Sequence, residues 1–179
     1  MSATRTIRFE RELDNDLQKI AKHHRMTVNS IVNKSVKQYV EWDRHAEEFE
    51  LVEIGPALLN KLMKRQTLDE ARELGRQGAK DVIIPSIEHV FVNLTYRNVI
   101  EFFRRFSKYT RRFNFEDTAE GRTHVVLIRQ PMGLKWSAFY GAMLDEILEE
   151  LGIRAKLTIG PETCIARFEL EEIPEQDGS

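Results

Sequence analysis

The side chains best suited to recognition chemistry lie near the start of the chain, where polar and apolar residues alternate. Thr4, Thr6 and Arg8 alternate with Ile7 and Phe9, so an extended backbone would place the first three on one face. An arginine can pair with guanine O6 and N7, and a threonine can bond a base or touch a thymine methyl. This spacing predicts a face that reads DNA bases. The alternative for Arg8 is a solvated surface charge.

A strand with this pattern needs a partner for its backbone groups, and the residues up to Val40 predict no second strand. The economical solution is pairing with the same strand of another copy, which gives a dimer with a two-stranded antiparallel ribbon. Such a ribbon fits the major groove of DNA. Arg5 falls on the inward side of the strand, and we expect it to contact a backbone phosphate near the fraying end.

Two helices are predicted to follow the strand. The first runs from about Glu12 to Arg25, and the second begins after Thr27, which suits an N-cap. Their apolar stripes are Leu13, Leu17, Ile20 and Ala21 in the first, and Ile31, Val32, Val36, Tyr39 and Val40 in the second.

This order of strand, helix, turn and helix resembles the ribbon-helix-helix family of DNA-binding repressors. The resemblance covers residues 4–40 and implies an interlocked homodimer on double-stranded DNA. It also implies that the turn of Thr27, Val28 and Asn29 binds a phosphate through the amides at the helix start. For Thr27, a helix cap without a ligand is the alternative.

The distribution of charge supports DNA binding by the N-terminal residues, although the whole chain has a formal net charge of −2. Residues 1–40 hold eight Lys or Arg against four Asp or Glu, a local balance of +4. From Glu41 the balance reverses, with five acids in the ten residues up to Glu50. This reversal predicts the end of a first domain.

Length and composition set the domain plan. The 179 residues, 41% of them hydrophobic, allow a ribbon-helix-helix domain over 1–48, an α+β domain over 49–173 and a disordered tail over 174–179. The polar start predicts no signal peptide, and no apolar run approaches the length of a membrane span. One cysteine excludes an internal disulfide framework. We therefore expect a cytoplasmic protein.

The second domain mixes helical and strand patterns and predicts an α+β sandwich, with helices on one face of a single sheet. Thr67 and Glu70 form a capping-box pattern that opens a helix ending at Gly75 to Gly78. Residues 116–122 look like a polar loop, and Ser86 to Leu94 fit either a strand or a helix. Strands are predicted at 49–54, 82–84, 123–129, 154–159 and 163–170, and further helices at 96–113 and 134–151. An amphipathic helix is also predicted after Gly55 and Pro56, with these apolar residues on one side: Leu58, Leu59, Leu62 and Met63.

The residues that could bind a ligand in the second domain follow no clear motif. Four side chains could line an effector pocket, with core packing as the alternative: Trp136, Phe139, Tyr140 and Met143. The basic run from Arg104 to Arg112 fits either a second nucleic-acid patch or a solvated helix face. The five histidines show no ligand spacing, so we expect no metal and no cofactor.

The sequence contains no Walker loop, nucleophile elbow or His-Glu-x-x-His motif, so we expect no enzyme. We predict a sequence-specific transcriptional regulator of the repressor type, dimeric or of higher order, whose C-terminal domain senses a small-molecule effector, oligomerises the protein, or does both. The alternative is an antitoxin-like or scaffolding protein whose C-terminal domain binds a partner protein.

Overall fold

The computed structural model describes residues 3–49, 51–52 and 54–170. The chain divides into two compact units, Met1–Glu47 and Glu48–Ser179, and each is described by itself. The tail predicted at 174–179 lies outside the described residues.

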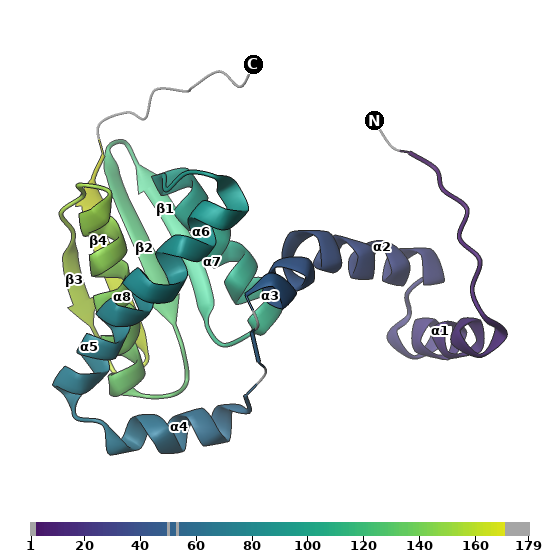
Figure 1. Ribbon diagram of the computed structural model, residues 1–179, viewed down its shortest axis with the longest axis horizontal. Coiled ribbons are helices and arrows are strands. Elements are labelled where there is room, and N and C mark those ends of the chain that lie inside the picture. Colours follow the sequence, from purple (N-terminus) through teal and green to yellow (C-terminus); the bar gives the residue numbers. More distant parts are fainter. Residues whose placement is uncertain (1–2, 50, 53, 171–179) are drawn as a thin grey trace. The chain divides into compact units, whose positions relative to one another are not determined.

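The N-terminal unit is helical after an extended start (Figure 1). Helix α1 (Arg11–His24) ends where Arg25 adopts a left-handed conformation, with φ 53°. Helix α2 (Val28–Gln38) begins at Thr27, whose hydroxyl accepts the amide hydrogen of Ser30 at 3.1 Å. The helical run then continues through a π-helical turn, η1 (Tyr39–Asp43), into α3 (Arg44–Glu48). The predicted helix pair and its N-cap are therefore present.

Residues 3–10 are assigned to no helix or strand, although a strand was predicted from Thr4 to Phe9. A strand is defined by pairing, and the single chain offers no partner for this segment within the described N-terminal unit. The ribbon itself is therefore not part of the structure and stays a prediction about a second copy.

The C-terminal unit combines helices with one antiparallel sheet, so the α+β class is confirmed at this level. Thr67 caps α5 with both bonds of a capping box: its hydroxyl accepts from the Glu70 amide, and its own amide donates to the Glu70 carboxylate. The helical elements are α4 (Pro56–Arg65), α5 (Leu68–Gly78), η2 (Ala79–Ile83), α6 (Ile84–Phe91), α7 (Tyr96–Thr110) and α8 (Leu134–Glu150).

The sheet has the strand order β1-β2-β4-β3. Strands β1 and β2 form one hairpin, β3 and β4 form the other, and β2 pairs with β4 between them. All neighbours are antiparallel, and β1 and β3 are the edges. Alternate residues face the helices: Phe115 of β1, Val126 and Ile128 of β2, and Cys164 and Ala166 of β4. The strands are β1 (Asn114–Glu120), β2 (Thr123–Arg129), β3 (Lys156–Ile159) and β4 (Thr163–Glu169).

Helix α8 is the central layer of the C-terminal unit, because opposite faces of it contact α5 and the sheet (Figure 1). A Cβ built on Gly75 of α5 would lie 2.2 Å from the carbonyl oxygen of Phe139, so the two helix backbones nearly touch. A Cβ on Gly141 would lie 2.4 Å from Cδ1 of Ile159 in β3. The obstructing atom at Gly75 belongs to the backbone, so only glycine fits there, whereas at Gly141 the end of the Ile159 side chain would have to move.

Three sequence predictions for the C-terminal domain were wrong. No strand occurs in the described part of 49–54, and the strand predicted at 82–84 lies in the helical run of η2 and α6. The loop predicted over 116–122 is mostly strand β1, closed by a tight turn in which Gly121 has φ 59°. Strand β1 is an edge whose outward side is polar, so it lacks the apolar alternation of a half-buried strand.

We predict that Gly75→Ala lowers the free energy of unfolding by about 1–3 kcal/mol, because the methyl group would overpack the contact between α5 and α8. Gly78→Ala is the matched control on the same helix, since its Cβ would meet Met143 Cε at 3.5 Å, an ordinary contact. There we expect a gain of about 0.5–1 kcal/mol from helix propensity. Urea unfolding of both variants measures the difference. Equal effects would contradict the close approach.

Asp145 on α8 provides a pH-dependent prediction. Burial, together with nearby Glu149 and Glu146, raises the pKa of its carboxyl above the ordinary value of 3.8. The folded state therefore binds this proton more tightly than the unfolded state, and the associated stability is lost as pH rises through the folded pKa. Asp145→Asn should raise the Tm at pH 7 and bring little change near pH 3. A Tm difference that is constant across pH would refute this.

Candidate functional site

The residues predicted to read DNA lie on the extended start of the N-terminal unit. Thr4, Thr6 and Arg8 are exposed, as is Arg5. Ile7, predicted to face inward, is 53% exposed in the single chain. The segment therefore presents its polar side chains, and its apolar side is only partly covered in one copy, because Phe9 is half-buried and Ile7 is exposed.

The apolar stripes of the N-terminal unit are also uncovered. Six large hydrophobic side chains of this unit are each 45–53% exposed: Ile7, Leu13, Ile20, Val36, Tyr39 and Val40. Ala21 of α1 is buried, and Ile31 and Val32 of α2 are half-buried. An apolar surface that is this extensive in so small a unit is typical of a protein interface.

The start of α2 is suited to an anion. Thr27 uses its hydroxyl on the Ser30 amide, while Val28 and Asn29 lie in the first turn, where amide groups have no acceptor inside the helix. The Asn29 side chain accepts a hydrogen bond from Asn33 at 3.2 Å. The first turn of α2 contains no acidic residue, so the positive end of the helix dipole is not neutralised locally.

The four residues considered for an effector pocket pack mainly against one another and the core. Trp136, Tyr140 and Met143 are at most 8% exposed, and the Trp136 ring lies edge-on to Phe139 at 5.3 Å between centroids. The indole N–H donates to the Asn60 side chain at 2.9 Å. Burial raises the pKa of Tyr140 to about 12. Core packing thus accounts for this group.

The basic run at the end of α7 is engaged within its own unit. Arg105 donates to Glu101 at 2.8 Å and lies over the Phe91 ring, and Arg104 lies 3.5 Å from the Asp117 carboxylate. Arg112 donates to the carbonyl of Ile54 at 3.3 Å. These contacts favour a solvated helix face over a second nucleic-acid patch.

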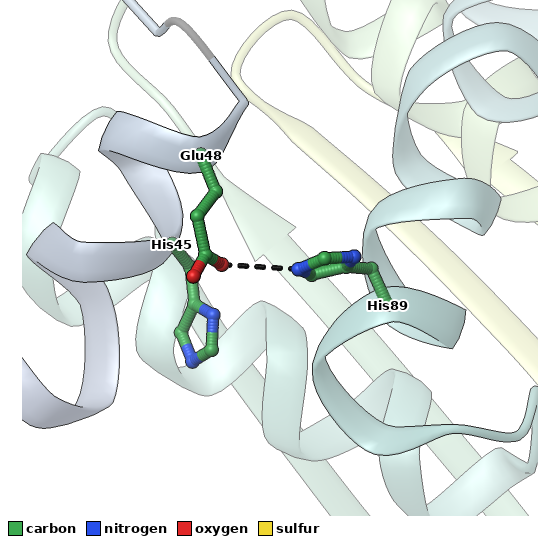
Figure 2. Close-up of side chains that lie close together, drawn as sticks. All are labelled: His45, Glu48 and His89. Atoms are coloured by element: carbon green, nitrogen blue, oxygen red, sulfur yellow. Dashed lines mark hydrogen bonds and ion pairs between the residues drawn. The ribbon is translucent and has the colours of Figure 1, made fainter.

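Sequence analysis missed an acid–histidine pair of the C-terminal unit. Glu48 Oε2 and His89 Nε2 lie 3.0 Å apart although 41 residues separate them, and Figure 2 shows the carboxylate facing the ring. His45, also drawn there, precedes Glu48 by one turn of α3. The two C-terminal residues offer two metal ligands, and a zinc site needs three or four. Within either unit alone, the described residues group no three such side chains.

A second polar cluster connects α7 to the sheet. The Tyr96 hydroxyl donates to Asp117 Oδ1 at 2.7 Å and lies 3.2 Å from Nδ1 of His124. Because the phenol has one proton and gives it to Asp117, Nδ1 of His124 must carry the hydrogen of the second bond. Burial, and then the bond to Asp117, raise the pKa of Tyr96. The phenol is thereby held protonated as a donor, which suits a structural connection better than a catalytic base.

Comparison with known proteins gives no match to any family model, curated protein or solved structure. Among the described residues, no helix combines the length and apolar character that crossing a membrane requires.

We predict that Tyr96→Phe lowers the free energy of unfolding by about 1–3 kcal/mol, because it leaves the half-buried Asp117 carboxylate without its short hydrogen bond. The same change in an Asp117→Asn background should cost less, since the charge that needs the donor is already gone. Urea unfolding of the four proteins in this double-mutant cycle gives the coupling. Strict additivity would contradict the assigned bond.

Proposed function

We propose that the protein is a dimeric, sequence-specific DNA-binding regulator of transcription, of the ribbon-helix-helix type. The observation that carries the proposal is the exposed apolar surface of the N-terminal unit, which extends from Ile7 through α1 and α2 to Val40. A second copy would cover this surface and would supply the missing strand partner for residues 4–9.

The same arrangement would give the dimer its DNA-contacting groups. Two paired strands would present two copies each of Thr4, Thr6 and Arg8 to the major groove. The start of each α2, with Val28 and Asn29 in its first turn, would bind a phosphate on either side. The local charge of +4 over residues 1–40 supports binding to a polyanion.

The C-terminal unit would act as the regulatory or oligomerising part. Its core is separate from the N-terminal unit, since the chain divides at Glu47 and Glu48. Its sheet and helices contain the largest fully buried side chains among the described residues, including Phe103, Ile87 and Ile128. A domain with its own core can bind an effector or another copy while the N-terminal unit engages DNA.

The experiment is a selection of binding sites from random duplex DNA with the full chain, followed by affinity measurements with variants. Arg8→Ala should cost about 1–3 kcal/mol at the preferred site and relax base choice at one position per half-site. Asn29→Ala should weaken binding to all sequences alike, because a phosphate contact carries no base information. Arg129→Ala, an exposed arginine of the C-terminal sheet, is the control that should change neither.

The selected sites should be inverted repeats, because a two-fold ribbon reads two equivalent half-sites. Binding that shows no sequence preference, or that persists unchanged in Arg8→Ala, would overturn the proposal. Recovery of a stable complex with a second protein, together with an absence of DNA binding, would favour the scaffolding alternative.

A further inference from the structure

The sheet of the C-terminal unit has an inner face, which its helices cover, and an outer face. On the inner face the rings of Phe103 in α7 and Phe115 in β1 stack with centroids 5.5 Å apart. Helix α8 meets the same face at Ile159 and Cys164. Alternate residues of each strand point to the outer face. None of these outward residues is buried, so the outer face is open within the described part of the chain.

Strand β2 is apolar on both of its faces. Its inward residues Val126 and Ile128 are at most 2% exposed. Its outward residues Val125 and Leu127 are half-buried, and Leu127 pairs with Ile165 of β4, which is also half-buried. A continuous apolar run is typical of a strand buried on both faces, whereas a strand with one solvated face alternates. The sequence of β2 therefore indicates a second layer over the outer face.

Opposite charges flank this apolar centre. Glu116 and Glu120 point outward from edge strand β1, and Lys156 and Arg167 point outward from β3 and β4 on the other side. All four are exposed. Among the described residues, none of them takes part in an ion pair. Each side of the face thus offers the charge that the opposite side lacks.

Two copies of this face can pack on each other about a two-fold axis. If the axis runs parallel to the strands, between β2 and β4, then β1 of each copy lies over β3 of the other, and β2 lies over β4. Leu127 meets Ile165 of the other copy, because these cross-strand partners lie at one level of the sheet. Sheets packed face to face about 10 Å apart keep their strands aligned to within about 30° in this way. The apolar centres then cover each other.

The same axis brings the opposite charges together. The strand register places Lys156 of β3 at the level of Thr118 of β1. Lys156 therefore lies over Thr118 of the other copy, whose outward neighbours along β1 are Glu116 and Glu120. The two-fold symmetry forms this contact twice.

The remaining outward charges do not oppose this packing. Arg129 lies over Thr163 of the other copy, and Glu169 lies over Thr123, since each pair is matched across β2 and β4. No two like charges are placed directly opposite each other, an arrangement that would be destabilising.

The size of the face sets the expected strength of the contact. Four strands about 4.8 Å apart, three of them with seven residues, cover roughly 440 Å² in projection. A standard interface takes about 800 Å² from each partner. We therefore expect an association in the micromolar range.

We propose that the outer face of the sheet is a self-association surface, on which the C-terminal unit of a second copy docks face to face. Leu127 and Ile165 form the centre of the contact, and Lys156 of each copy lies between Glu116 and Glu120 of the other. This contact gives the C-terminal unit of the proposed regulator an oligomerising role, but it does not require DNA binding.

The test is sedimentation equilibrium of the full chain in an Ile20→Glu, Val36→Glu background. Both residues are exposed on α1 and α2, so these changes disrupt the separate contact proposed for the N-terminal unit. With its sheet unchanged, this background should dimerise with a Kd of about 1–100 μM. Adding Leu127→Lys should raise the Kd at least about tenfold. Val92→Lys is the matched control, since Val92 is 82% exposed and lies outside the sheet.

An exchange of charges separates the docking contact from a defect in folding. In the same background, Lys156→Glu alone should weaken dimerisation, and so should Glu116→Lys with Glu120→Lys. The three changes together should restore it, because the attraction across the axis is then reversed in sign but retained. Circular dichroism checks that each variant is folded.

The proposal is overturned if the background chain stays monomeric over this concentration range, if Leu127→Lys and Val92→Lys change the Kd equally, or if the charge exchange fails to restore dimerisation. Leu127→Lys in the otherwise unchanged chain reports on the N-terminal contact separately. That variant stays dimeric if the proposed function is right, and it becomes monomeric if the sheet is the sole contact.

Discussion

The close packing of α8 between α5 and the sheet is the constraint on which the C-terminal unit depends. Gly75 allows the backbone of α5 to meet α8 at Phe139, and Gly141 allows the opposite face of α8 to meet β3 and β4 at Ile159 and Cys164. Helix α8 is therefore buried on both sides, which explains why its sequence is apolar almost all round. The position of its last turn, in turn, fixes where the chain leaves for β3.

The two units solve different physical problems. The C-terminal unit has a buried apolar core of its own, which includes Phe103 and Ile87, although other apolar side chains such as Val92 are exposed. Some of its polar side chains pair internally, as Tyr96 does with Asp117. The N-terminal unit leaves a large apolar surface uncovered. The polar contacts at the start of α2 are local ones, between Thr27 and Ser30 and between Asn29 and Asn33. Among the described residues of the N-terminal unit, Ala21 is the one buried apolar side chain, so this unit depends on a covering surface more than the C-terminal unit does.

Local signals in the sequence predicted most of the helices, but not the helical run of η2 and α6, and they did not predict the polar strand β1. The Thr67 capping box, the stripe of α7 and the long apolar α8 depend on neighbouring residues, so they could be recognised without the fold. Strand β1 could not, because its inward Asp117 is stabilised by Tyr96, which is distant in sequence. The Glu48–His89 pair likewise depends on tertiary packing, which one sequence does not reveal.

The edges of the sheet also determine how copies of this domain can associate. Edge strand β1 carries Glu116 and Glu120 outward and Asp117 inward, while the other edge, β3, spans only Lys156–Ile159. Charged side chains on an edge strand, an inward-pointing charge and a short edge strand all hinder the pairing of one sheet with the sheet of another copy. Growth of a continuous sheet from one copy to the next is therefore disfavoured at both edges, and a high local concentration of this domain would not by itself lead to fibrillar aggregation.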